Sequence, residues 1–181
     1  MVIAVGSNSP SRAGDPRLTV LAAIAALGDL FGDVCASKLY QTPAFPTGSG
    51  PDFVNAACSF YTDMPAEDVL LALHAIEAEF GRERVARWGE RTLDLDLIAI
   101  GDLVLPDVEI FNHWRNLPIE DQKKQAPDAL VLPHPRVQNR AFVLVPMADI
   151  APDWVHPVLG LSTAEMLAQL PASERDEIQA I

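Results

Sequence analysis

Two stretches of the sequence carry apolar residues at helical spacing, and each is flanked by short runs typical of strands. The first begins at Asp15 and Pro16, which suit an N-cap and a first helical position, and its apolar stripe continues to Phe31. The second runs over residues 65–80, and Gly81 marks its end. Both stretches are predicted to be amphipathic helices.

Four shorter segments are predicted to be strands, at residues 2–5, 34–41, 52–62 and 92–100. With the two helices they give the order β-α-β-β-α-β. This order is typical of the ferredoxin-like plait, an α+β fold in which helices cover one face of a mostly antiparallel sheet. Additional C-terminal elements are expected, with a polar helical piece near residues 119–125 and a last helix near 163–170. The length suits a single domain, 1–181.

The chain is acidic, with 13 Lys and Arg against 25 Asp and Glu and a formal charge of −12. This balance argues against nucleic acid as a partner. No basic leader opens the chain, and no apolar run approaches the roughly 18 to 20 residues of a membrane span. Cys35 and Cys58 lack metal-ligand spacing, which favours free thiols in a reducing compartment. We therefore expect a soluble cytoplasmic protein without membrane contact. A monomer is also expected.

Arginine is concentrated in one part of this acidic sequence. Ten of the thirteen basic residues are arginine. Four of these fall within ten positions, at Arg82, Arg84, Arg87 and Arg91, and Arg136 and Arg140 lie further along. The planar guanidinium matches pairs of phosphate oxygens, so this concentration indicates a small and highly anionic ligand. The alternative is a solvated loop whose arginines pair with neighbouring glutamates.

Asp94 and Asp96 lie two positions apart on the predicted strand 92–100, so their side chains point to the same face. Leucines alternate with them and line the other face. A strand buried on both faces would hold two carboxylates at a high desolvation cost unless a cation compensates them. Magnesium needs only one or two carboxylates when substrate phosphates complete its shell. We predict a metal site here, and two solvated aspartates remain the alternative.

Two long segments contain these residues: RWGERTLDLDLIAIGD and LPHPRVQNRAFVLVPMADIAPDW. They resemble two hallmarks of the 6-hydroxymethyl-7,8-dihydropterin pyrophosphokinases of folate biosynthesis. A GSN turn and the YQTP and DFVNA segments are also similar, so the resemblance spans most of the chain. It implies that ATP binds with two Mg²⁺ ions, and that the pterin hydroxyl then attacks the β-phosphorus and releases AMP.

The resemblance also implies roles for individual residues by matched motif. The implied metal ligands are Asp94 and Asp96, and the implied catalytic residues are these two with Arg82 and Arg91. The implied ATP-binding residues are Arg84, Arg87, His134 and Arg140. The implied pterin-binding residues are Thr42, Pro43, Phe53, Asn55, Glu77, Trp88 and Phe142. A flat heterocycle suits such a set because aromatic rings stack on its faces and an amide reads its edge.

The chain departs from the family pattern at two places. Phe53 stands where the family often has tyrosine, which removes a hydroxyl and keeps the stacking surface. An apparent insertion at 108–131 contains Trp114 and two lysines, and its composition favours a surface decoration over a lid or partner site.

Two other functions fit part of the pattern. A metal-dependent nucleotidyltransferase or glycosyltransferase also uses Asp-x-Asp, but the Gly-Ser turn of nucleotidyltransferases closely precedes the acids, whereas Gly6 and Ser7 lie far upstream here. A non-catalytic ligand-binding plait would have no use for paired aspartates beside four arginines. A phosphate-binding GxxxxGK[ST] loop and the protein-kinase motifs are missing, so ATP must be held in another way, and the flanking arginines are the obvious alternative.

Overall fold

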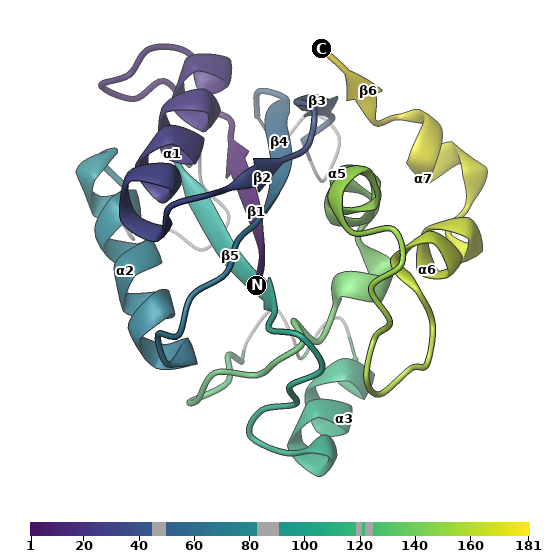
Figure 1. Ribbon diagram of the computed structural model, residues 1–181. Helices are drawn as coiled ribbons and strands as arrows, with labels where there is room; N and C mark the ends of the chain where they lie inside the picture. Colours follow the sequence, from purple (N-terminus) through teal and green to yellow (C-terminus); the bar gives the residue numbers. More distant parts are fainter. Residues whose placement is uncertain (45–49, 83–90, 119–120, 122–124) are drawn as a thin grey trace.

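The computed structural model describes residues 1–44, 50–82, 91–118, 121 and 125–181. Its architecture is mixed α/β, with one antiparallel sheet between two groups of helices (Figure 1). The strands are β1 (Val2–Ser7), β2 (Cys35–Ala36), β3 (Tyr40–Thr42), β4 (Phe53–Ser59), β5 (Asp94–Ala99) and β6 (Gln179–Ala180). The helices are α1 (Pro16–Phe31), α2 (Ala66–Glu79), α3 (Val108–Asn116), the 3-10 turn η1 (Val137–Asn139), α5 (Ala141–Ile150), α6 (Thr163–Gln169) and α7 (Ala172–Asp176).

The strands follow the order β5-β1-β4-β3-β6, and β2 also pairs with β4. Strand β1 lies between β4 and β5 and is antiparallel to both. The predicted strand 34–41 is divided into β2 and β3. Ser37 lies between them, and its Oγ accepts the Ala57 N–H at 2.9 Å while its own N–H donates to the Ala57 carbonyl. A side-chain oxygen there takes the place of a backbone acceptor in the ladder.

One face of the sheet is covered by the two predicted helices. Asp15 caps α1 as expected, because its carboxylate accepts the Leu18 N–H at 2.9 Å and Pro16 is the first helical residue. Leu27 of α1 and Leu73 of α2 are fully buried against this face. The helical periodicity of the sequence therefore identified the two elements of this layer.

The second face of the sheet is covered too, and the prediction of helices on one face was therefore wrong. Helix α5 packs against β4, and Leu144 and Met147 are fully buried there together with Met166 of α6. Figure 1 shows α5 and α6 on the side of the sheet opposite α1 and α2. Helix α5 is apolar on nearly all sides and contains Pro146, so it lacks the stripe by which an amphipathic helix is found.

The segment between β5 and η1 contains helix α3, which begins earlier in the chain than the predicted helical piece at 119–125. Asp107 caps this helix, and its carboxylate accepts the Ile110 N–H at 2.8 Å. Of residues 119–125, only Asp121 and Gln125 lie within the described part of the chain. Leu105 and Leu132 exchange two backbone hydrogen bonds, of 2.8 and 3.1 Å, and these tie the two ends of the segment together.

Helix α3 is anchored by one side chain, Phe111, which is fully buried. Its ring centroid lies 5.4 Å from that of His156, which is also fully buried and lies 5.5 Å from the Trp154 ring. Burial lowers the pKa of His156 to about 4, so its imidazole is neutral at pH 7. A segment expected to be a surface decoration thus has an aromatic anchor in the C-terminal half of the fold.

We predict that Phe111→Ala lowers the free energy of unfolding by about 3 to 5 kcal/mol, because it leaves a cavity in this aromatic cluster. Ile110→Ala, on the same helix and 40% exposed, is the matched control and should cost less than about 1 kcal/mol. Guanidinium denaturation measures both values. Equal losses in the two variants would mean that Phe111 does not anchor the segment.

Candidate active site

The first of the paired aspartates of β5 belongs to a row of three residues that crosses the sheet, Asp94, Gly6 and Asn55, which we call the polar row. Gly6 of β1 pairs with Asp94 on one side and with Asn55 of β4 on the other. A Cβ at Gly6 would lie 2.6 Å from Asn55 Oδ1, so only glycine leaves room for this amide. Asp96 is two residues further along β5 and on the same face, as predicted.

Asp94 is held between two arginines. Its side chain is 17% exposed, and its Oδ1 lies 2.6 Å from Arg82 Nη1 while Oδ2 pairs with Arg91. Burial and the charge of Asp96 raise the pKa of Asp94, although Arg91 and Arg82 oppose this shift. Two carboxylates whose negative charges work against each other in a partly buried position are a suitable donor set for a divalent cation.

Glu77 of α2 lies against β5, away from Thr42, Phe53 and Asn55, which were also predicted to bind the pterin. Its side chain is 2% exposed, and its Oε1 accepts the Leu95 N–H at 2.8 Å and pairs with Arg82. A single buried carboxylate therefore holds both an edge strand and the arginine that contacts Asp94. The structure thus groups Glu77 with Arg82 and Asp94.

His134 lies beside β5, where its N–H donates to the Ile98 carbonyl at 2.7 Å. Its Nδ1 accepts the Arg136 N–H at 3.1 Å. Burial among protein atoms, together with Arg140 and Arg136, holds the pKa of His134 well below its usual range. The imidazole is therefore neutral at pH 7, with its proton on Nε2, and presents a hydrogen-bond donor. Arg140 reaches the acid pair, with Nη1 3.5 Å from Asp96 Oδ2.

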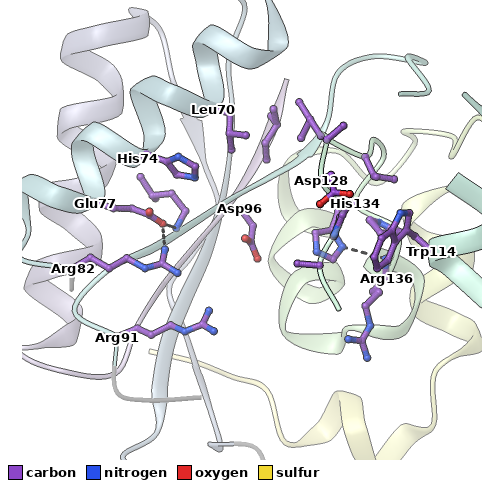
Figure 2. Close-up of a pocket in the computed structure, with 18 of the residues that line it drawn as sticks. Leu70, His74, Glu77, Arg82, Arg91, Asp96, Trp114, Asp128, His134 and Arg136 are labelled. Carbon is purple, nitrogen blue, oxygen red and sulfur yellow. Dashed lines mark hydrogen bonds and ion pairs between the residues drawn. The ribbon is translucent and has the colours of Figure 1, made fainter. Parts of the chain in front are cut away.

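A cleft of about 1000 Å³ opens along β5. Figure 2 shows Glu77, Arg82 and Arg91 on one wall, His134 and Arg136 on the other, and Asp96 between them. Helix α2 contributes Leu70 and His74, and the segment before His134 contributes Trp114 and Asp128. These last four residues carried no signal in the sequence, because their shared surface exists only in the folded chain.

Four of the residues predicted to bind the pterin, Thr42, Pro43, Phe53 and Asn55, lie on or next to β3 and β4 and do not line this cleft. Asn55 Nδ2 donates to Thr42 Oγ1 at 2.7 Å, and both side chains are buried. Thr42 pairs with Phe53 across β3 and β4, and exposed Pro43 follows β3. Phe142 lies at the start of α5, where its ring centroid is 5.6 Å from the Arg140 guanidinium.

Three predicted site residues, Arg84, Arg87 and Trp88, lie outside the described residues. The GSN turn gains a role that its sequence did not reveal. Asn8 Oδ1 accepts the Arg91 N–H at 2.8 Å, and the Asn8 N–H donates to the Arg91 carbonyl at 3.1 Å. Ser7 Oγ donates to the Thr92 carbonyl at 2.6 Å. The turn after β1 thereby fixes the backbone that leads into the acid pair.

Among the described residues, His, Cys, Asp and Glu form no group of three or more suited to a metal ion. Within the same residues, no helix combines the length and apolar character needed to cross a membrane.

Comparison with known proteins places these observations in a family. Residues 2–152 match the family model described as 7,8-dihydro-6-hydroxymethylpterin-pyrophosphokinase. A 2-amino-4-hydroxy-6-hydroxymethyldihydropteridine pyrophosphokinase of Synechocystis is 37% identical over 134 residues, which are 74% of this chain and 58% of that protein. The protein of the same name from Pseudomonas aeruginosa is 37% identical over 171 residues, or 93% of this chain and 90% of that protein.

Solved structures give the same result for the fold. The crystal structure of a Plasmodium falciparum HPPK-DHPS with pteroate superposes on this chain with a TM-score of 0.64 at 13% sequence identity. The match covers 99% of this chain and 47% of the Plasmodium chain. The chain thus spans less than two thirds of this structure and of the Synechocystis relative, at 47% and 58% of their lengths.

We predict that Glu77→Ala lowers the free energy of unfolding by about 3 kcal/mol, because it leaves the Leu95 N–H without its acceptor and removes one of the two carboxylates that pair with Arg82. Glu77→Gln keeps an oxygen for the Leu95 N–H and should cost clearly less. Chemical denaturation of the two variants tests this order. If Gln were as destabilising as Ala, the backbone contact would contribute nothing measurable.

Proposed function

Because this chain belongs to the 7,8-dihydro-6-hydroxymethylpterin-pyrophosphokinase family, we propose that it transfers a diphosphate from ATP to 6-hydroxymethyl-7,8-dihydropterin in folate biosynthesis. The products are AMP and the pterin diphosphate. The observation that carries the proposal is the position of Asp94 and Asp96. On one side of them lies the arginine-lined cleft, and on the other side lies Asn55, across Gly6 of β1. This arrangement suits two substrates that meet at the acid pair.

The nucleotide is assigned to the cleft. Its phosphates face Arg82, Arg91 and the neutral His134, whose Nε2–H can donate to a phosphate oxygen. The other ATP-binding residues proposed are Arg84, Arg87 and Arg140. Guanidiniums and one imidazole donor supply the charge and the directed hydrogen bonds that a triphosphate requires.

The pterin is assigned to the polar row on the sheet face. Asn55 donates to Thr42 through Nδ2, so its Oδ1 can accept from the edge of a heterocycle. Phe53, Trp88 and Phe142 are proposed to cover the ring faces, and Pro43 to border the site. Glu77, assigned to pterin binding by motif, is better supported as the residue that positions Arg82.

In the proposed reaction the pterin hydroxyl attacks the β-phosphorus of ATP. A new bond forms between oxygen and phosphorus, the bond to the α-phosphate oxygen breaks, and AMP leaves with that oxygen. The hydroxyl proton passes to solvent. Asp94 and Asp96 are proposed to hold two Mg²⁺ ions, which when bound would neutralise phosphate charge and keep the attacking and leaving oxygens in line. Arg82 and Arg91 are proposed to stabilise the negative charge that shifts among the phosphate oxygens during transfer.

Several wider assignments belong to the same proposal. The strand order β5-β1-β4-β3 supports the ferredoxin-like plait, extended by C-terminal elements into one domain over 1–181. Two free cysteines support a cytoplasmic location. A net charge of −12 supports small-molecule substrates over nucleic acid. A monomer without membrane contact remains a prediction.

Product identity tests the function. Incubation of the chain with ATP, Mg²⁺ and the hydroxymethyl-dihydropterin should yield AMP and the pterin diphosphate in equal amounts by chromatography. Release of ADP, or of free pyrophosphate as from a nucleotidyltransferase, would reject the proposal. ATP binding without turnover would favour the non-catalytic alternative.

We predict that Asp94→Asn and Asp96→Asn each abolish turnover, with a loss of several kcal/mol of transition-state stabilisation, because each removes a ligand charge. Asp102→Asn, in an exposed turn, is the control and should keep wild-type rates. Circular dichroism should report an intact fold for all three variants. Near wild-type activity in both site variants would show that the pair does not bind the metal.

We also predict that Arg82→Ala and Arg91→Ala lower the chemical rate more than the affinity for ATP, because they meet charge that is redistributed in the transition state. Single-turnover rates and equilibrium binding separate the two effects. Arg12→Ala removes an exposed arginine paired with Glu79 and serves as the control. A loss confined to ATP affinity would assign both arginines to ground-state binding.

A further inference from the structure

Helix α3 carries two aromatic side chains with different surroundings. Phe111 is fully buried in the aromatic cluster with His156, whereas Trp114 lines the cleft. The two residues are three positions apart, so they are neighbours on the helix surface. The anchor therefore fixes the part of the helix from which Trp114 extends. The His113 ring lies edge-on to the indole, at 5.6 Å and 84°, and further restricts it.

The wall opposite Trp114 is formed by helix α2. Leu70 and His74 line the cleft from α2, while Arg82 and Arg91 lie further along the same side (Figure 2). The cleft thus has an arginine-rich part beside Asp96 and another part bordered by Leu70, His74 and Trp114, with Asp128 and Arg136 on the same wall as Trp114. A ligand with an anionic part and a planar part matches this division.

Of the two proposed substrates, only the nucleotide suits this second part. Both carry a planar heterocycle, but the residues assigned to the pterin, Thr42, Phe53 and Asn55, do not line the cleft. Arg82 and Arg91, which are assigned to the triphosphate, do line it. A base attached to phosphates at Arg82 and Arg91 must therefore lie within the same cleft.

We propose that Trp114 contacts the face of the purine base of ATP and is an affinity-determining residue of the nucleotide site. The segment around α3 then contributes to substrate binding through this side chain, and takes no part in the chemical step. This inference rests on the proposed function, since it takes ATP as the occupant of the cleft. A large rigid ring offers a stacking surface at small entropic cost, and base–aromatic stacking changes affinity about five- to a hundredfold.

The test compares Trp114→Leu, which keeps an apolar side chain and loses the aromatic face, with Trp114→Phe, which keeps a ring. Isothermal titration calorimetry measures the binding of ATP with Mg²⁺, in the absence of the pterin. Inorganic tripolyphosphate, which has no base, is titrated in parallel. Asn116→Ala, exposed on the same helix and outside the cleft, is the matched control.

We expect Trp114→Leu to bind ATP about tenfold more weakly and tripolyphosphate as the wild type does, and Trp114→Phe to recover most of the ATP affinity. Unchanged ATP binding by Trp114→Leu would overturn the proposal. So would an equal loss for ATP and tripolyphosphate, because that pattern means a damaged phosphate site. A wild-type chain that makes AMP and the pterin diphosphate while Trp114→Leu binds ATP normally would leave the proposed function intact and remove this inference alone.

Discussion

The alternation of leucine and aspartate along β5 is the constraint on which the rest of the site depends. Leu95 and Leu97 are buried in the core beneath α2, and this burial forces Asp94 and Asp96 onto the opposite face. Because β5 is an edge strand, its backbone also needs partners outside the sheet. Glu77 supplies one to the Leu95 N–H and so links α2 to β5. A shift of one residue in the register of β5 would bury both acids in the core.

This position places the acids between two surfaces of different chemistry. On the side of α2 and His134, the cleft carries cations and a ring from α3, which suits a nucleotide. On the sheet face, Gly6 leaves space for the Asn55 amide, which suits the edge of a pterin. The arginine contacts of Asp94 and Asp96 lie where these surfaces meet. Transfer between two bound molecules requires little covalent chemistry from the protein but strict positioning of both.

Local sequence signals predicted the parts of the structure that depend on neighbouring residues. The cap at Asp15 and the stripe behind it gave α1, and spacing by two put Asp94 and Asp96 on one face. Two kinds of feature were beyond such signals. Helix α5 is buried on most sides and includes Pro146, so no periodicity marks it. The partners of Glu77 and the wall formed by α3 are contacts between distant segments, and the spacing of residues along the chain does not encode them.

A crystal structure with a non-hydrolysable ATP analogue, Mg²⁺ and the hydroxymethyl-dihydropterin tests the central claim most directly. We predict that two Mg²⁺ ions bridge Asp94 and Asp96 to the triphosphate, with the nucleotide in the cleft and the pterin beside Asn55. The pterin hydroxyl should then lie in line with the β-phosphorus, close to the distance of about 3 to 3.5 Å at which such groups react. Metal ions bound elsewhere, or both rings on the same side of β5, would contradict the account.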